Sequence, residues 1–354
     1  MGYKLDTVVW EITLKCQLDC LHCGSKADLS KRPNELSTEE ALALIEQLSD
    51  LQCRRIVLSG GEPFLRQDWP ILAQRIMDLG IILGFITNGF SIGDKEIDIL
   101  LRIKPNAVSF SIDGKNSETH DYFRGRKGVF DHVTSVIRKL VNNNQFVSIV
   151  TSVCKVNLDQ LDDMLKMLIE LGVSAWQLQT ATPMGRMPKD LALDDHEYYK
   201  LAKFISENRP KYANIITITE GDCIGYYSKL SPTMGIPNWK GCQAGMRVMG
   251  IESDGGIKGC LSLHGSNIHN EDYSDFIEGN IRERPLKDIW NDKNNFAYNR
   301  RFTPDMLQGF CKDCKYGLIC RGGCSEKALS FTNSVHGSPY CLYHYEQTHP
   351  DLSS

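Results

Sequence analysis

The chain has 354 residues, of which 42% are hydrophobic and 24% charged, and its formal net charge is −4. This length allows about two domains around a large core, and the composition is that of a globular protein rather than a disordered one. The slight negative charge provides no electrostatic basis for binding nucleic acid or an anionic membrane, so neither is expected as a partner.

The first residues and the cysteine count indicate the compartment. Residues 1–15 carry acidic side chains and lack the apolar centre of a signal peptide. No apolar run approaches the roughly 20 residues of a membrane-spanning helix. We therefore predict a cytoplasmic protein, in which thiols stay reduced and disulfides are rare. Its 13 cysteines are more typical of metal ligands than of disulfides.

From about residue 7 to residue 180, short β-rich runs alternate with amphipathic helical stretches. Strands are predicted at 8–13, 55–59, 81–87, 107–112, 146–153 and 175–179. Helices are predicted at 38–51, 69–79, 94–102, 129–142, 158–171 and 194–208, the first with a capping signal at Ser37 or Thr38. Such β-then-α units with right-handed crossovers form a parallel α/β sheet, either doubly wound or a partial barrel.

The alternation ends near residue 210. Residues 211–241 include a run rich in Gly, Pro and aromatic residues, which predicts an irregular connection. A hairpin is predicted beyond it, from 248–252 to 257–260 through the turn Asp254-Gly255-Gly256. The C-terminal third is rich in cysteine and would depend on bound metal for stability. We therefore divide the chain into a barrel at 1–210, a connecting segment at 211–241 and a cysteine-rich domain at 242–354.

Three cysteines directly follow the first predicted strand. Cys16, Cys20 and Cys23 have the spacing C-x3-C-x2-C, and no fourth cysteine lies beside them. A cubane iron–sulfur cluster has four irons, each normally bound by one thiolate. Three thiolates leave one iron open for a ligand that is not protein, as in catalytic metal sites. Half of a zinc site is the alternative.

Polar residues and glycines follow two later strands. The second predicted strand ends in the run SGGEP, where Gly60 and Gly61 let backbone approach a ligand and Glu62 can accept from an ammonium group. The fourth ends near Ser111 and Asp113, whose side chains suit the hydroxyls of a ribose. Capping of the following turn is the alternative for this last pair.

The C-terminal region carries a second cysteine pattern, C-x12-G-x4-C, a gap, C-x2-C-x5-C-x3-C, a gap, and C. Its members are Cys242, Cys260, Cys311, Cys314, Cys320, Cys324 and Cys341, with the glycine at Gly255. This set exceeds one tetrahedral site. A two-zinc ribbon is one interpretation, but the spacings beside an open N-terminal cluster favour iron–sulfur.

The cysteine triplet and the downstream GGEP run together resemble the radical S-adenosylmethionine (SAM) superfamily. The resemblance implies a partial (β/α)6 barrel of the TIM type. It implies a 4Fe–4S cluster on Cys16, Cys20 and Cys23, whose open iron SAM chelates. In that family's pattern the amino group of SAM meets Gly60, Gly61 and Glu62, the ribose meets Ser111 and Asp113, the carboxylate meets Arg124, and Gln179 contacts the cofactor through its backbone.

The seven-cysteine pattern resembles the SPASM auxiliary-cluster domain of peptide-maturing radical SAM enzymes. The resemblance implies two auxiliary clusters and therefore three 4Fe–4S clusters in the chain. The second auxiliary cluster would be bound by Cys311, Cys314, Cys320 and Cys341. The first would be bound by Cys242, Cys260 and Cys324, with Cys223 as the proposed fourth ligand.

The combined resemblance implies an enzyme that oxidatively modifies a peptide or protein, by a crosslink or a side-chain oxidation. It would receive electrons from a donor such as a flavodoxin or ferredoxin. One alternative substrate is a small cofactor precursor such as a tetrapyrrole or quinone. A non-enzymatic electron carrier or redox regulator is the other alternative, in which the GGEP run and Arg124 would have no purpose.

The acid–base group and the peptide-binding partner are less defined. Glu220 and Asp222 are acid–base candidates near the barrel mouth, with solvated loop carboxylates as the alternative. Sulfatase-maturing members carry an aspartate after a first-cluster cysteine, whereas Cys260 is followed by Leu261, which disfavours that branch. Because the first ligand is residue 16, we expect a separate leader-binding protein or direct recognition by the auxiliary domain.

Overall fold

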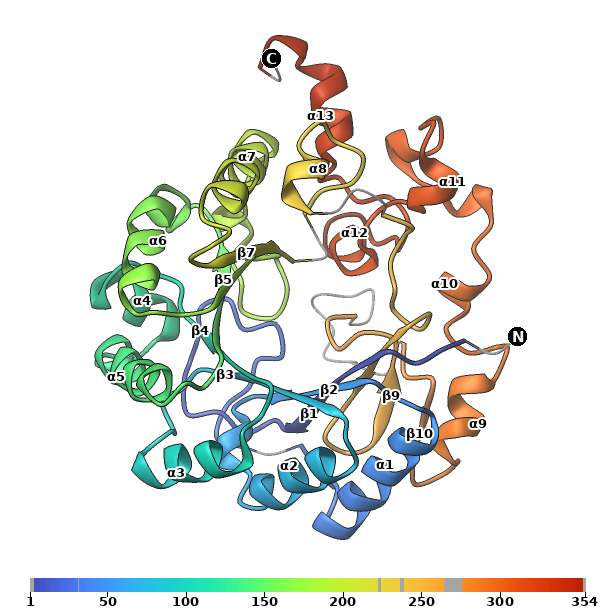
Figure 1. Cartoon of the computed structure of the whole chain (residues 1–354). Coiled ribbons are helices and arrows are strands. Elements are labelled where there is room, and N and C mark those ends of the chain that lie inside the picture. The colour runs from blue at the N-terminus through green and yellow to red at the C-terminus, as the bar shows by residue number, and fades with distance from the viewer. Residues whose placement is uncertain (1–2, 31, 222–223, 236–238, 264–275, 353–354) are drawn as a thin grey trace.

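Seven parallel strands follow one another in chain order around an open barrel (Figure 1). The computed structural model describes residues 3–30, 32–221, 224–235, 239–263 and 276–352. The barrel strands are β1 (Thr7–Thr13), β2 (Arg55–Gly60), β3 (Ile82–Thr87), β4 (Ala107–Ser111), β5 (Val147–Val153), β6 (Ala175–Thr180) and β7 (Thr217–Glu220). Each pairs in parallel with the next, so all seven finish at the same end of the barrel.

Helices cover the outside of this sheet (Figure 1). They are α1 (Thr38–Asp50), α2 (Trp69–Asp78), α3 (Asp94–Ile103), α4 (Ser117–Arg124), α5 (Val129–Asn142), α6 (Leu161–Glu170) and α7 (Asp195–Lys211). A doubly wound sheet would have helices on both faces and a reversal in strand order. Neither occurs among the described barrel elements, so the structure confirms a partial barrel.

The alternating burial along each strand explains this arrangement. In β3, Leu83 and Phe85 are fully buried, whereas Ile82, Gly84 and Ile86 keep part of their exposure. The fully buried face packs against the surrounding helices in one continuous core. The half-buried face therefore points toward the interior of the barrel.

The C-terminal region extends the same sheet. Strand β8 (Val248–Ile251) pairs in parallel with β1, and β9 (Gly256–Lys258) and β10 (Gly279–Asn280) follow in antiparallel order. The remaining helices are α8 (Ser231–Met234), α9 (Leu286–Asn291), α10 (Ala297–Arg300), α11 (Gly317–Cys320), α12 (Ser325–Thr332) and α13 (Leu342–Thr348). The predicted hairpin is confirmed by β8 and β9. The division at residue 242 stays a prediction, and the sheet crosses it.

Local signals placed most elements correctly. Ser37 caps α1 by accepting from the backbone N–H of Glu40, while the Glu40 carboxylate accepts from the backbone of Ser37. The sequence did not predict α4, β7 or the pairing of β8 with β1. Helix α4 and strand β7 have only 8 and 4 residues, which are too short for a clear periodicity. In the described part of the chain, no helix has both the length and the apolar character to cross a membrane.

Candidate functional site

Cys16, Cys20 and Cys23 lie in a loop that leaves β1 at the carboxyl end of the barrel. Burial, the Glu62 carboxylate and the two neighbouring thiols raise the pKa of Cys16 to about 12. Clustered thiols of this kind become thiolates only when a cation shares their charge, and coordination deprotonates them outright. The predicted triplet is thus brought together in surroundings that suit metal binding.

The triplet is not arranged around a single ion. Within the described ranges, no three or more His, Cys, Asp or Glu side chains already stand as ligands of one metal ion. In a cubane each thiolate binds a different iron atom. The assignment of these cysteines to a cluster stays a prediction that the common loop supports.

The two glycines after β2 hold this loop in place. A side chain on Gly60 would lie 2.2 Å from the carbonyl oxygen of Thr13, and one on Gly61 would lie 2.3 Å from that of Leu14. The backbone N–H of Gly61 donates to the Thr13 carbonyl oxygen at 2.9 Å. The glycines thus let the end of β2 pack on the segment just before Cys16, a role that the sequence did not indicate.

Glu62 is fully buried and bonded within the protein. Its Oε1 accepts from the Thr87 hydroxyl at 2.7 Å and from the Phe64 N–H, and its Oε2 accepts from the Asn88 N–H at 2.8 Å. Burial outweighs these donors and raises the pKa of Glu62 to about 7. The carboxylate supports the loop after β3, and its predicted contact with the amino group of SAM stays a prediction.

Asn88 is a site residue that the sequence analysis missed. Its side-chain amide donates to the Cys16 sulfur at 3.5 Å. A polar residue directly after a barrel strand was the available signal, since such positions share the carboxyl end of the sheet. Hydrogen bonds to cluster sulfurs tune the reduction potential of iron–sulfur sites, so Asn88 belongs with the cysteine loop.

Arg124, at the end of α4, lies against the cysteine loop. Its guanidinium forms an ion pair with Asp113 at 2.5 Å and donates to the Cys20 sulfur at 3.7 Å. Its Nε is buried and has no hydrogen-bond partner among the described residues. A buried, unpaired cationic donor suits an anionic ligand, so Arg124 fits the carboxylate that the sequence assigned to it.

Both carboxylate oxygens of Asp113 contact other groups of the protein. Its Oδ1 accepts from the backbone N–H of Ser152 at 2.9 Å, and its Oδ2 lies 3.5 Å from His22 Nε2 and pairs with Arg124. Although burial raises it, the pKa of Asp113 is lowered overall by the Arg124 guanidinium. Burial lowers the pKa of His22 to about 4, so its ring is neutral near pH 7. Asp113 positions Arg124, and its predicted contact with a ribose stays a prediction.

Ser111 and Gln179 lie at the ends of β4 and β6. Both are half-buried on the inner face of the sheet. The Gln179 amide donates to the Ser152 hydroxyl at 3.2 Å. Both lie at the carboxyl end of the sheet, with β5 between their strands, and their predicted contacts with the cofactor stay predictions.

Arg186 is a second residue that the sequence analysis missed. It follows β6, and its guanidinium donates to the carbonyl oxygen of Cys20 at 3.0 Å and to that of Ala27 at 3.2 Å. Its backbone N–H donates to the Cys23 carbonyl oxygen at 3.0 Å. Arg186 therefore clamps both ends of the cysteine loop. No local pattern marks it, because the contact spans 166 residues of sequence.

Several of the C-terminal cysteines lie near one another, and their assignment to two auxiliary clusters stays a prediction. Burial and the nearby Cys341 and Cys314 thiols raise the pKa of Cys311 to about 12, and the same neighbours act on Cys320. Burial and the Cys242 thiol raise the pKa of Cys260 to about 12. Cys324 begins α12, a helix whose Leu329 packs against Cys242 and Cys260. Cys223 and Asp222 lie outside the described residues.

Glu220 makes contacts that differ from those of a free acid–base group. Its Oε2 lies 3.4 Å from Arg209 on α7, on the outer side of β7. Through this ion pair the Glu220 carboxylate connects strand β7 to helix α7. Its role in proton transfer stays a prediction.

Two family models match the regions that this geometry singles out. The radical SAM superfamily matches residues 10–168, and the SPASM iron–sulfur cluster-binding domain matches residues 242–315. Residues 10–168 belong to the radical SAM superfamily, and residues 242–315 form a SPASM domain. The chain is therefore a radical SAM enzyme, and these two domains bind SAM and iron–sulfur clusters. The cysteine groups and the unpaired Arg124 Nε fit these cofactors.

Relatives of this radical SAM protein match over nearly the whole chain. An AdoMet-dependent heme synthase of Methanosarcina barkeri is 29% identical over 344 residues, which cover 95% of this chain and 96% of the relative. The PqqA peptide cyclase of Rhizobium meliloti is 26% identical over 338 residues, which cover 94% of this chain and 85% of the relative. Streptococcus suis SuiB bound to S-adenosylmethionine has a TM-score of 0.75 at 18% identity, covering 93% of this chain and 75% of SuiB. That likeness confirms the fold alone.

Proposed function

We propose that this enzyme uses SAM to oxidise a peptide or protein at an unactivated C–H bond, forming a crosslink or an oxidised side chain. When bound, SAM and the reduced N-terminal cluster supply a 5′-deoxyadenosyl radical, and the SPASM clusters supply electron acceptors. The substrate loses a hydrogen atom, an electron and a proton. The product is therefore lighter than the substrate by two hydrogens.

The residues of the barrel mouth would hold and orient the cofactor. Cys16, Cys20 and Cys23 would bind the N-terminal cluster, while Arg124, held by Asp113, would pair with the carboxylate of SAM. Gly60, Gly61 and Glu62 would meet its amino group, Ser111 and Asp113 would meet its ribose, and Gln179 would contact it through its backbone. Two further 4Fe–4S clusters would be bound by Cys311, Cys314, Cys320 and Cys341, and by Cys242, Cys260, Cys324 and Cys223.

The residue types on the inner face of the barrel support a peptide as the substrate. The inward positions of β2–β6 alternate with fully buried ones. Apart from Arg55 at the start of β2, their polar members are serine or glutamine: Ser59, Ser109, Ser111, Ser148, Ser152, Gln177 and Gln179. Hydroxyls and amides match the neutral N–H and C=O groups of a peptide. A substrate with several carboxylates would require cationic partners, and the one cation among these inward positions, Arg55, starts β2 at the end of the barrel away from the cysteine loop. The peptide cyclase among the relatives supports the same assignment.

A small cofactor precursor such as a tetrapyrrole is the second candidate. The heme synthase among the relatives supports it, and its similarity to this chain covers nearly the full length of both proteins. Five relatives, 26–29% identical, are named as heme, pre-heme d1 or Fe-coproporphyrin III synthases, and two, 26–28% identical, are the PqqA peptide cyclase and a mycofactocin maturase. The relatives therefore favour the small precursor, whereas the inward residues of the barrel favour the peptide. The substrate has to be decided by experiment.

The test uses anaerobically purified enzyme with SAM and dithionite, or with a flavodoxin or ferredoxin as electron donor. One series contains short peptides encoded beside the gene, with and without a separate leader-binding protein, and the other contains carboxylated tetrapyrroles. We expect 5′-deoxyadenosine together with a peptide lighter by two hydrogens, and neither product from the Cys20→Ala variant. Conversion of a tetrapyrrole with unchanged peptides would favour the second candidate.

A further inference from the structure

Tyr298 lies beside the cysteine pair that would bind the first auxiliary cluster. It belongs to α10 and packs with Cys242 and Cys260 around a small apolar cluster of Ala244 and Leu329. A tyrosine hydroxyl is protonated near neutral pH, so it can act as a hydrogen-bond donor.

The Tyr298 hydroxyl is buried, and it makes no hydrogen bond within the described part of the chain. It lies over Gly259, the residue before Cys260, where a β-carbon would come within 2.0 Å of the hydroxyl oxygen. An unsatisfied buried hydroxyl destabilises a fold by about 1–3 kcal/mol, so native structures normally provide an acceptor. Glycine at position 259 leaves the space that this hydroxyl occupies.

The neighbours of Tyr298 hold it in this place. The Tyr298 carbonyl oxygen lies 2.6 Å from His336 Nε2. The Asn299 amide donates to the carbonyl oxygens of Cys242 at 3.0 Å and Ala244 at 2.8 Å. Helix α10 is therefore anchored to the segment that carries Cys242. These bonds fix the backbone of Tyr298, and the edge-to-face contact with Phe276 fixes the place of its ring.

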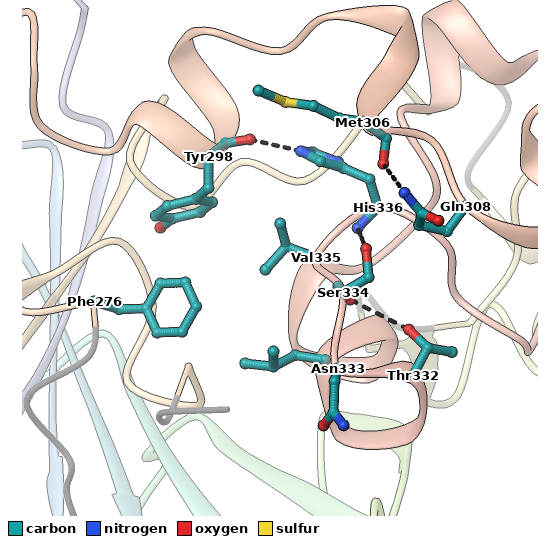
Figure 2. A pocket seen from close by; sticks show the side chains of 10 residues that line it. Phe276, Tyr298, Met306, Gln308, Thr332, Asn333, Ser334, Val335 and His336 are labelled. Atoms are coloured by element: carbon teal, nitrogen blue, oxygen red, sulfur yellow. Dashed lines mark hydrogen bonds between the residues drawn. The ribbon is translucent and has the colours of Figure 1, made fainter. Parts of the chain in front are cut away.

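The Tyr298 ring also borders a pocket of about 840 Å³. Figure 2 shows its ring next to that of Phe276, and the two meet edge to face at 5.4 Å between ring centres. Leu329 and Val335 line the same pocket. The ring thus separates the pocket from the cysteine pair, while the hydroxyl belongs to the cysteine side.

We propose that the Tyr298 hydroxyl donates a hydrogen bond to a sulfur atom of the iron–sulfur cluster held by Cys242 and Cys260, and that this bond raises the reduction potential of that cluster. The inference rests on the proposed function, which assigns a cluster to these cysteines. Reduction adds negative charge to the cluster, so a fixed donor stabilises the reduced state more than the oxidised state. Tyr298 is a positioning residue that acts through the cluster.

The test is the Tyr298→Phe substitution in the cluster-loaded enzyme, followed by redox titration with electron paramagnetic resonance. We expect the reduction equilibrium of one auxiliary cluster to fall about tenfold, which is about 59 mV for one electron. The other clusters should keep their potentials. The control Tyr212→Phe removes a hydroxyl from the end of α7 and should change none of them. An unchanged potential in Tyr298→Phe, with the clusters present, would overturn the proposal.

A second measurement needs no variant. Wild-type enzyme exchanged into D2O should show an exchangeable deuteron coupled to the reduced auxiliary cluster, and its absence would also overturn the proposal. The Cys260→Ala variant tests the cluster assignment separately from the Tyr298 hydrogen bond. If it retains the full iron content and all cluster signals, the cluster assignment of the proposed function is wrong, and the Tyr298 proposal falls with it. If it loses one cluster, a negative result with Tyr298→Phe counts against Tyr298 alone.

Discussion

The Asp113 carboxylate is a fully buried charge whose main partner is the buried guanidinium of Arg124. Removing one partner of such a pair leaves the other charge desolvated and uncompensated. Surface pairs behave differently, because water solvates both charges before and after the change. The pair of Asp94 and Lys139 is of this second kind, and it lies on the outside of the barrel.

We predict that Asp113→Asn lowers the free energy of unfolding by about 3 kcal/mol. Asp94→Asn, the matched control, should leave it nearly unchanged. Both can be measured by anaerobic urea unfolding of the purified enzyme. Equal effects of the two substitutions would show that the buried Asp113–Arg124 pair contributes no more to the free energy of unfolding than a surface pair does. The Asp113 variant should also bind SAM more weakly, since Arg124 loses its support.

Glu62 predicts a pH dependence of stability. Its pKa is about 7 in the fold, against an ordinary value of 4.5, because burial penalises its charged form. Between these pH values the folded chain binds a proton that the unfolded chain has lost. The contribution of Glu62 is therefore largest below pH 4.5 and is lost as the pH rises through about 7, a change of roughly 3 kcal/mol.

The comparison of wild type with Glu62→Gln isolates this effect. Unfolding midpoints measured at pH 5 and pH 8 should differ more in wild type than in the variant, because glutamine does not titrate. The variant is expected to be less stable at both pH values, since its amide nitrogen faces a backbone donor of the Glu62 site. Parallel pH profiles of the two proteins would contradict the prediction.

The junction between the end of β2 and the cysteine loop depends on two glycines. A side chain at Gly61 would meet the carbonyl oxygens of Leu14 and Lys15 at 2.3 and 2.4 Å, so the strand end would have to move off the loop. Gly84, in the neighbouring strand β3, provides a contrast. A side chain there would meet only Val57 at an ordinary 3.7 Å.

We predict that Gly61→Ala removes the N-terminal cluster, with a loss of about four irons per chain. Production of 5′-deoxyadenosine should fall to the level of the Cys20→Ala variant, because the reaction needs the N-terminal cluster. Gly84→Ala should retain its iron and its activity. Iron analysis and a product assay of both variants test the prediction, and a fully loaded Gly61→Ala enzyme would contradict it.

The whole molecule is built around one sheet and one main core. Strand β8 covers the edge of β1, with Thr7 opposite Val248. The core that lies under the barrel helices also contains Leu342 and Tyr345 of α13. The barrel and the cysteine-rich region therefore share their hydrophobic stabilisation.

We predict that a chain ending at residue 241 does not fold into a stable barrel. It would expose the β1 edge, which favours aggregation, and would lose the core residues contributed by β8 and β9. Size-exclusion chromatography of the truncated and full chains would test this. A monodisperse truncated chain with full helical content would show that the barrel folds alone.

The sequence predicted those structural features that depend on residues close together in the chain. Burial alternates along β3, and Ser37 caps α1, because these features arise between near neighbours in the chain. The same holds for the cysteine spacings, which identified both metal-binding regions. Asn88 and Arg186 could not be found in this way, because their contacts with the cysteine loop span 72 and 166 residues.

The amino-acid sequence by itself determined the order of strands and helices, the two cysteine groups and the family, because each depends on local periodicity or fixed spacing. Only the tertiary structure decided that β8 joins β1, that Asp113 holds Arg124, and that the Tyr298 hydroxyl lies over Gly259, the residue before Cys260. These are contacts between distant segments. Their geometry depends on how the whole core packs, and no local pattern encodes it.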